Sequence, residues 1–470
     1  MTQPTYTELV EVIVEMRTEL NFLRAENAAL KVRVADLEAQ LGTNSQNSSQ
    51  PPSADGPGKR TTRSLRTPSK RKPGGQDGHR GQTLTQVADP DVVIRHEPSC
   101  CHGCGSDLAG ATEVNCSRRQ VFDIPPIKVH VTEHQIISRR CHCGTTSTGL
   151  VPAQATAPVQ YGPVMCAVII YLFMGQFLSQ KRTAQAISEL FAIPVSDGTV
   201  AAVTSRAAGD LTEFLAQVTA RLNASPVVHF DETGLRCEGR NHWLHSASTP
   251  MWTRLFFHRK RGTEAMAKMN ILPSFTGTAV HDAWAPYDTY TAARHALCNA
   301  HLLRELQAVA DHHHASTADT PDAWCWAQQV SHALLALHKA AAAHPDTPVD
   351  PALVIVETTK IRHALLAATH PDGAIGRKHR ALARRIHRRE ADYLKFASDP
   401  AIPFTNNPAE QEIRMTKIRQ KISGTMRTEK GAGHFADLRS YLQTTAKHGI
   451  PALAALTQLT SRNPWLPSHP

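Results

Sequence analysis

VVHFDETG, at residues 227–234, is a run of apolar and β-branched residues that leads into an acid and then a glycine. The pattern predicts a short buried strand with Asp231 at its end. GTAVHD, at residues 277–282, has the same form and ends in Asp282. One acid cannot hold catalytic metal ions, but two acids at the rim of one sheet indicate a metal site there.

A third acid opens a helix further along the chain, at Glu410 in the segment TNNPAE, residues 405–410. Two strand-end aspartates and a later helical glutamate suit a ribonuclease-H-like nucleotidyl-transfer core. In the alternative interpretation, Asn407 is the N-cap and Glu410 stands at N3, where it only completes a capping box.

Basic residues recur at helical spacing on the same face as Glu410, at Arg414, Lys417 and Lys421. Cations beside an acid, on a face that approaches DNA, favour a metal ligand at a scissile phosphate over a cap. We therefore predict that these three cations bind DNA.

The remaining elements of the predicted core follow in an order that matches the ribonuclease H fold. Residues 242–245 and 253–257 read as antiparallel strands, and a helix around residues 264–272 leads back to the strand ending at Asp282. The core is expected over residues 223–425, with a basic helical insertion at about 311–395 whose charges are either solvated or a track for phosphates. A helical segment, residues 426–470, closes the chain.

The composition bounds the class of protein. The 470 residues allow three or four domains, and a net charge of +10 favours a polyanionic partner, nucleic acid first. The start has neither a basic nor an apolar signal region, and the most apolar run, residues 164–175, is too short to span a membrane. We expect a cytoplasmic protein, associated with the nucleoid when bound to DNA, without a membrane partner.

Residues 1–42 carry a leucine-zipper pattern. Apolar residues recur seven apart at two heptad positions, with one asparagine among them. The d positions are Leu9, Met16, Leu23, Leu30 and Leu37, and the a positions are Ile13, Leu20, Asn27, Val34 and Leu41. The pattern predicts a coiled coil and hence a homodimer or higher oligomer, the alternative being an amphipathic helix packed on its own domain.

Residues 43–90 are rich in Ser, Gln, Pro, Gly, Lys and Arg and are predicted to be a basic disordered linker. Arg71 and Lys72 belong to its acid-free cationic tract, which either binds DNA phosphates without sequence choice or is simply solvated.

Two cysteine knuckles predict a small zinc ribbon over residues 91–152. Cys101 and Cys104 form the first, Cys141 and Cys143 the second, and a glycine follows each pair. Clustered cysteine pairs in a cytosolic chain suggest one structural zinc rather than disulfides. Cys100 competes with Cys101 as a ligand, and residues 120–125 and 128–134 read as the ribbon strands.

Residues 160–222 are predicted to be helical. A turn before residue 197 resembles a helix-turn-helix, a DNA-binding element, although any pair of antiparallel helices looks similar. Cys298 and His301 form only half a zinc site, so a structural role is expected for them.

Taken together, the motifs resemble the transposases of the insertion sequence 66 family nearly end to end. The matching stretches are the zipper, residues 74–81, the two knuckles, and residues 118–123, 231–234, 282–287, 298–301, 406–414, 421–424 and 440–442. At Asp77, similar proteins often have proline or another residue.

The resemblance implies a multidomain α+β protein whose Asp231, Asp282 and Glu410 form an Asp-Asp-Glu site for two magnesium ions. Such an enzyme binds the terminal repeats of its element, cuts there, and joins the ends to target DNA, sometimes with companion proteins encoded by the element. Two rival interpretations remain: a DNA-binding regulator with zinc ribbon and zipper but no catalysis, and a structure-specific nuclease.

Overall fold

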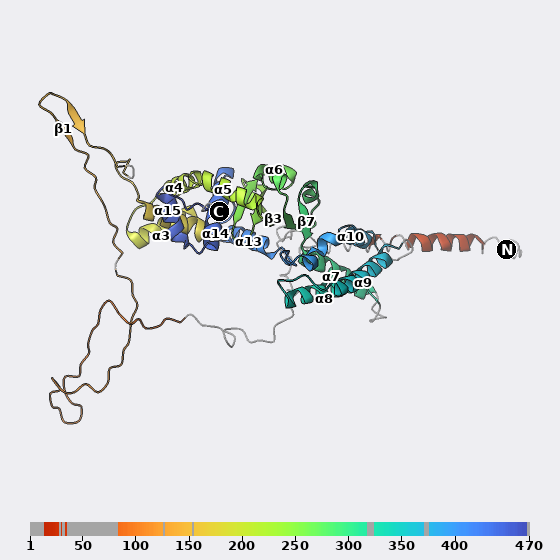
Figure 1. Cartoon of the computed structure of the whole chain (residues 1–470), viewed down its shortest axis with the longest axis horizontal. Coiled ribbons are helices and arrows are strands. Elements are labelled where there is room, and N and C mark those ends of the chain that lie inside the picture. The colour runs from red at the N-terminus through yellow and green to blue at the C-terminus, as the bar shows by residue number, and fades with distance from the viewer. Residues whose placement is uncertain are drawn as a thin grey trace, which may run out of the picture. The chain divides into compact units, whose positions relative to one another are not determined.

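The computed structural model describes residues 14–27, 30, 33–34, 83–125, 127–152, 155–316, 324–370 and 376–467. The chain divides into two compact units, Thr61–Gln135 on the one hand and Met1–Arg60 with Ile136–Pro470 on the other. Figure 1 traces the chain and labels its elements.

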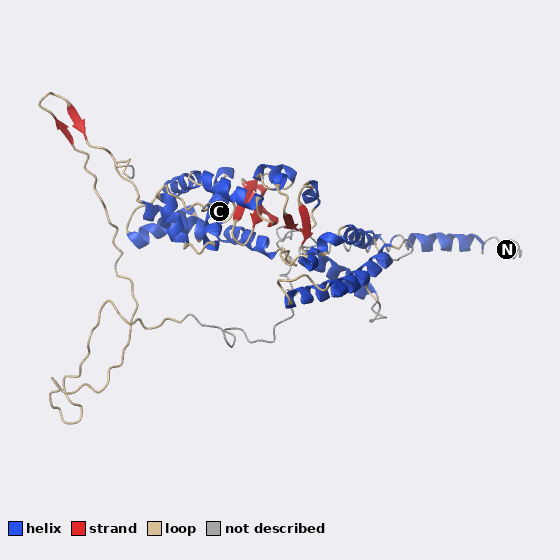
Figure 2. Ribbon diagram, viewed as in Figure 1, coloured by secondary structure: helices blue, strands red, loops and turns tan. Residues whose placement is uncertain are grey.

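A five-stranded mixed sheet positions the two predicted aspartates (Figure 2): Asp231 lies within β3 and Asp282 directly after β6. Its strands lie in the order β5-β4-β3-β6-β7. Their bounds are Val227–Cys237 for β3, Arg240–Ser248 for β4, Thr253–His258 for β5, Thr278–His281 for β6 and Arg294–Leu297 for β7. β4 runs antiparallel to both of its neighbours, β3 and β5, whereas β6 is parallel to β3 and β7 is parallel to β6. A helix, α6 (Thr263–Met269), precedes β6, so the elements follow the predicted order.

The first strand is longer than expected. β3 does not end at Asp231 but continues to Cys237, because its antiparallel pairing with β4 runs through to the Cys237–Arg240 pair. Only the parallel pairing with β6 stops early, at His229 opposite Val280. β6 begins after Gly277, where a Cβ atom would stand 2.7 Å from the Pro226 carbonyl oxygen. Glycine is therefore required for this close approach of two backbones.

Helices from both ends of the core share one hydrophobic core with the sheet. α2 (Pro163–Ile170), the π-helical turn Tyr171–Gly175, α3 (Gln180–Phe191), α4 (Asp197–Gly209) and α5 (Thr212–Asn223) precede it, and α14 (Glu429–Lys447) and α15 (Ala452–Thr460) follow. Ser440 and Thr444 of α14 each use a side-chain hydroxyl to accept from backbone N–H groups of β5, at 2.8 and 3.1 Å. This helix therefore covers and satisfies the free edge of the sheet.

The predicted helix pair before the core is present. Ser179 caps α3, and Ser196 caps α4 by accepting from the Thr199 N–H at 3.1 Å. α3 ends at Phe191, and the next residue, Ala192, has a φ of +53° that turns the chain away from the helix. Two capped helices joined by residues 192–196 are compatible with both a helix-turn-helix and an ordinary hairpin.

The insertion between Asp282 and Glu410 is helical, as expected. It contains the end of α7 (Asn299–Ser316), then α8 (Trp326–Ala343), α9 (Pro351–Thr369), α10 (Arg377–Arg388), α11 (Glu390–Tyr393) and α12 (Lys395–Ser398). α8 and α9 lie side by side (Figure 1) and share a core with α7 and α10. The chain then returns to the sheet as α13 (Asn407–Ser423).

The ribbon strands were predicted at the wrong place. The described residues of 120–125 and 128–134 form no strand; the hairpin consists of β1 (Ser138–Arg140) and β2 (Thr146–Thr148) around the second knuckle. Val121 and Val131 are almost fully exposed. With no apolar face buried, their alternating pattern has nothing to pair against, whereas the tight knuckle turn itself holds β1 beside β2.

The N-terminal pattern lies only partly within the described residues. Residues 14–27 are helical, and Met16, Leu20 and Leu23 are exposed on that helix. An exposed apolar seam is what a coiled coil leaves for its partner, but self-association stays a prediction. Most of the linker, including Arg71 and Lys72, lies outside the described residues. No described helix is long and apolar enough to cross a membrane.

Candidate active site

Two of the predicted acids meet at one edge of the sheet. Asp231 lies two residues beyond His229, the last residue of β3 that pairs with β6, and Asp282 lies two residues beyond its partner Val280. Continuing this register brings the two aspartates to the same level, at the carboxyl end of the parallel strands. The Asp282 Oδ1 atom accepts from the Trp284 N–H at 3.0 Å, which fixes the turn after β6.

Glu232, the neighbour of Asp231 on β3, is hydrogen-bonded by residues that no local sequence pattern indicated. Its carboxylate, 1% exposed, accepts two hydrogen bonds from Arg261, at 2.9 and 2.7 Å, and one from the Tyr287 hydroxyl at 2.6 Å. The Arg261 guanidinium stacks 3.9 Å from the Trp284 ring centroid. This network ties β3 to the loop after β6, which carries Asp282.

Glu410 reaches the same region from α13, and Asn406 sets where that helix begins. The Asn406 side chain donates to the Phe230 carbonyl oxygen at 2.7 Å, and its own oxygen accepts from His229 Nδ1 at 2.8 Å. Its backbone N–H donates to Cys298 Sγ at 3.1 Å. A single buried asparagine thus anchors the start of α13 to β3, one residue before Asp231.

The capping interpretation of Glu410 was wrong by one residue. The N-cap is Asn406, not Asn407, and its side chain makes no capping bond because it is bonded to β3. Glu410 therefore stands at N4, and no hydrogen bond satisfies its buried Oε1 atom among the described residues. A capping box explains neither the position nor the free oxygen.

The carboxylates repel one another. Burial, reinforced by Glu232, Asp282 and Glu410, raises the pKa of Asp231 well above its usual range. Burial and Glu232 likewise raise the pKa of Asp282 to about 7. Burial raises the pKa of Glu410, although the charges of Arg304 and Lys417 oppose the shift. Acids gathered in this way favour a bound cation, whose charge offsets their repulsion.

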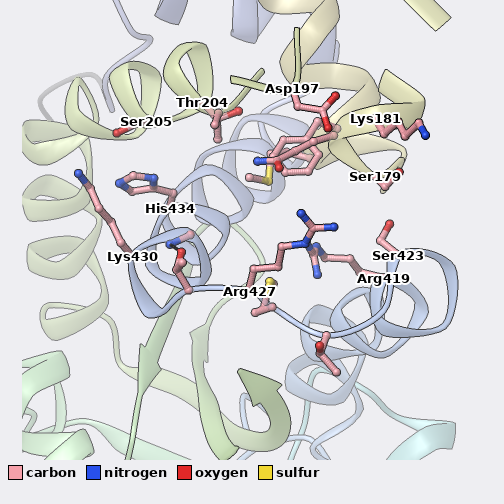
Figure 3. A pocket seen from close by; sticks show the side chains of 18 residues that line it. Ser179, Lys181, Asp197, Thr204, Ser205, Arg419, Ser423, Arg427, Lys430 and His434 are labelled. Atoms are coloured by element: carbon pink, nitrogen blue, oxygen red, sulfur yellow. Dashed lines mark hydrogen bonds between the residues drawn. The ribbon is translucent and has the colours of Figure 1, made fainter. Parts of the chain in front are cut away.

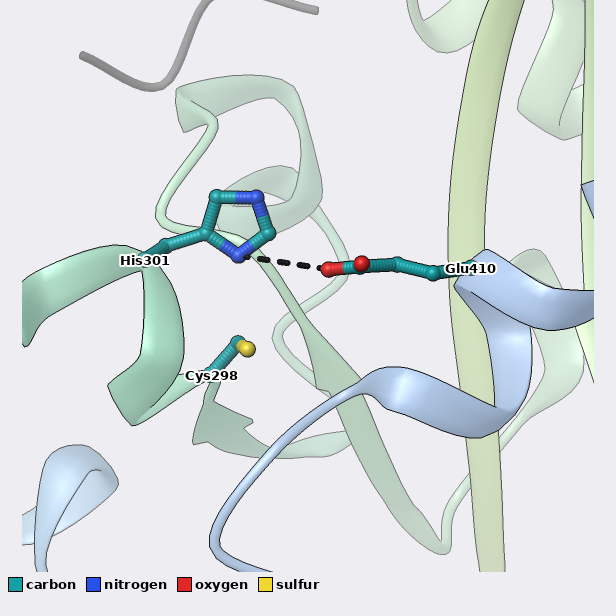
Figure 4. Close-up of side chains that lie close together, drawn as sticks. All are labelled: Cys298, His301 and Glu410. Atoms are coloured by element: carbon teal, nitrogen blue, oxygen red, sulfur yellow. Dashed lines mark ion pairs between the residues drawn. The ribbon is translucent and has the colours of Figure 1, made fainter. Parts of the chain in front are cut away.

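Cys298, His301 and Glu410 also converge, with one ligand atom from each lying within 4.8 Å of the others (Figure 4). The His301 Nδ1 atom is 3.8 Å from Glu410 Oε1, too far for a hydrogen bond. Burial raises the pKa of the Cys298 thiol to about 11, so without a bound cation the thiol stays protonated near neutral pH. The structural role predicted for Cys298 and His301 is compatible with this arrangement.

Comparison with known families identifies the chain. The family model described as "Transposase IS66 family" matches residues 158–434, more than half of the chain. This chain belongs to the IS66 transposase family. A model described as the zinc-finger binding domain of transposase IS66 matches residues 98–144, and a family of unknown function matches residues 1–85. No curated protein matches the chain.

The match to the zinc-finger domain of IS66 transposases supports a structural zinc in this chain. Both cysteine knuckles have the tight turns that bring the two cysteines of each pair toward one ion. The Gly105 N–H donates to the Cys101 carbonyl at 2.8 Å, and the Gly144 N–H to the Cys141 carbonyl at 2.9 Å. Both glycines have positive φ, +77° and +86°. A hydrogen bond with the Thr145 hydroxyl lowers the pKa of the Cys143 thiol to about 7, toward the thiolate that zinc binds.

The predicted DNA-binding cations of α13 lie at its surface. Arg414 and Lys421 are exposed. Lys417 is half-buried and close enough to Glu410 to oppose the rise in the pKa of that acid. In the basic insertion, by contrast, Arg385 of α10 pairs with Glu305, and Arg389, directly after α10, pairs with Asp288, so part of this positive charge is used within the fold.

Proposed function

We propose that the chain is a DNA transposase whose Asp231, Asp282 and Glu410 form the metal-binding acids of a ribonuclease-H-like core. The proposal is carried by the observation that Asp282 and Glu410 lie close enough to Asp231 to raise its pKa, while Glu410 has a buried oxygen without a hydrogen bond among the described residues. The strand order, with β4 as the one strand of the five that runs opposite to the others, supports the ribonuclease-H-like assignment.

Two magnesium ions fit these residues. Carboxylate oxygens are the ligands that Mg²⁺ prefers, and Asp231, Asp282 and Glu410 have raised pKa values that a cation would lower. When bound, such ions activate a water or a 3′ hydroxyl and stabilise the entering and leaving oxygens of an in-line displacement. No serine or tyrosine nucleophile is required.

The chain's own residues position this chemistry. The Arg261–Glu232–Tyr287 network orients the loop that carries Asp282, and Asn406 anchors the helix that carries Glu410. Arg414 and Lys421 extend the same helix with positive charge that attracts the phosphates of element ends and target DNA. Self-association through residues 1–42 would bring two such sites to two element ends.

Glu410→Gln tests the assignment. Gln keeps the shape of the side chain but lacks the charge that a hard cation needs, so we expect no cleavage and no strand transfer in magnesium. DNA binding should survive, because affinity comes from cations elsewhere.

Glu412→Gln is the matched control. It lies on the same helix, and its carboxylate already pairs with Lys447 at 2.6 Å, so we expect it to keep strand transfer. Wild-type strand transfer by Glu410→Gln would refute the triad. A wild-type protein that cuts without joining would instead be a nuclease, and one that does neither a regulator.

A further inference from the structure

A cavity of about 420 Å³ lies apart from the acids, between the helix pair and the end of α13 (Figure 3). One wall comes from α3 and α4, and the other from the end of α13, residues 425–428 and the first turns of α14. Arg419 on the second wall lies nine residues beyond Glu410 on the same helix, roughly 14 Å along its axis. The cavity is therefore a separate site that shares a helix with the catalytic acids.

The walls carry an excess of positive charge. The cationic residues are Lys181, Arg419, Arg427 and Lys430, whereas Asp197 is the single carboxylate. None of the four cations makes an ion pair with a residue that the structure describes. The N-terminus of α14, capped by Thr428, opens at the same place and adds partial positive charge.

Arg419 shows that this charge is built into the fold. Arg419 is only 7% exposed. Neither its Nε nor its Nη1 atom makes a hydrogen bond within the described part of the chain. Its guanidinium packs 5.3 Å from the Phe435 ring centroid. Burial lowers the pKa of Arg419 to about 10, so the group is charged at neutral pH. A buried, charged donor without an acceptor is unfavourable unless an anion binds it.

The other surface of the cavity is apolar. Phe173, Met174 and Met426, all buried side chains, contribute to its lining. An inorganic anion alone gains nothing from such a wall. A ligand with both a phosphate and a flat apolar ring uses both halves, and the volume lies in the usual range for small-ligand sites. Unpaired bases bind proteins in this way, by packing on aromatic and apolar side chains.

We propose that this cavity binds one unpaired nucleotide, with its phosphate on Arg419 and its base against Phe173, Met174 and Met426. This nucleotide is either one unit of a DNA strand or a free nucleotide in solution. Binding of a DNA strand in this cavity rests on the proposed function, because a transposase holds DNA along α13. Binding of a free nucleotide does not depend on that function.

The test compares Arg419→Met with Arg439→Met in the full chain. Arg439 is a matched control, because its guanidinium also lies over a phenylalanine ring, 5.4 Å from Phe177, and burial lowers its pKa to about 10, yet it does not line the cavity. The probes are a fluorescent single-stranded oligothymidylate, a fully paired duplex of equal length, and thymidine monophosphate. If Arg419→Met does not fold, Arg427→Gln takes its place, because Arg427 lines the same cavity at an exposed position.

We expect Arg419→Met to weaken binding of the single strand by roughly 10-fold to 100-fold and to reduce its salt slope by about 1. Arg439→Met should match the wild type, and the duplex should be affected less. In another outcome, thymidine monophosphate raises the melting temperature of the wild type and of Arg439→Met but not of Arg419→Met, while all three proteins bind the single strand equally. This result would support the site and reject DNA as the source of the nucleotide. Equal behaviour of both variants with every probe overturns the proposal. Failure of the wild type to bind any DNA would refute the proposed function, and the monophosphate would still test the cavity.

Discussion

Asp282→Asn should make the metal-free protein more stable while destroying its activity. The substitution keeps an oxygen for the hydrogen bond from Trp284 and removes a charge that the fold disfavours. The Asp282 pKa is about 7 in the fold against 3.8 ordinarily, a difference of about 3 units, which corresponds to roughly 4 kcal/mol. Because the side chain is only partly buried, solvent screens this penalty, and we expect about 1–3 kcal/mol.

The sign of the pH dependence follows from the raised pKa. Well below pH 4, Asp282 is protonated in both the folded and the unfolded chain, so the substitution changes no charge and gives no gain in stability. As pH rises from about 4 to about 7, only the folded wild type resists ionisation and loses stability; above about 7 the gap stays constant.

Urea unfolding with EDTA, followed by tryptophan fluorescence at pH 6, 7 and 8, measures the gap, since Trp284 lies beside the site. Magnesium should then stabilise the wild type and not Asp282→Asn. Asp399→Asn is the control: Asp399 accepts from the Ala401 N–H at 3.0 Å, the same turn bond, away from the acids. An Asp282→Asn protein no more stable than the wild type in EDTA, or stabilised equally by magnesium, would refute the acid cluster.

Two further predictions address the supporting structure. Tyr287→Phe removes a hydrogen bond to a buried carboxylate and should lower the free energy of unfolding by about 1.5–3 kcal/mol, whereas Tyr290→Phe, whose hydroxyl donates at 3.3 Å at the surface, should change it by less than about 0.5 kcal/mol; equal losses in urea denaturation would contradict the role of Tyr287. Metal analysis should find about one zinc per chain, lost in Cys104→Ser and kept in Cys116→Ser, and zinc retention in Cys104→Ser would argue against the first knuckle.

Local patterns were sufficient to predict the order of strands and helices in the core and the family. The apolar runs before Asp231 and Asp282 do form neighbouring strands, and the glycines after each cysteine pair do adopt positive φ. These signals are readable because strand alternation, helix periodicity and turn chemistry act over a few residues. The same rules misplaced the ribbon strands and the N-cap of α13, where a long-range contact outweighed the local preference.

Only the tertiary structure showed how the site is held together. Glu232 finds its partners 29 and 55 residues away in Arg261 and Tyr287, and Asn406 reaches back 176 residues to Phe230. That the Arg419 Nε and Nη1 atoms find no hydrogen bond among the described residues is likewise visible only once α3, α4 and α14 line a cavity around them. Such contacts have no sequence period, because chain folding rather than spacing brings their members together; burial then decides which charges matter, by removing the water that would screen them.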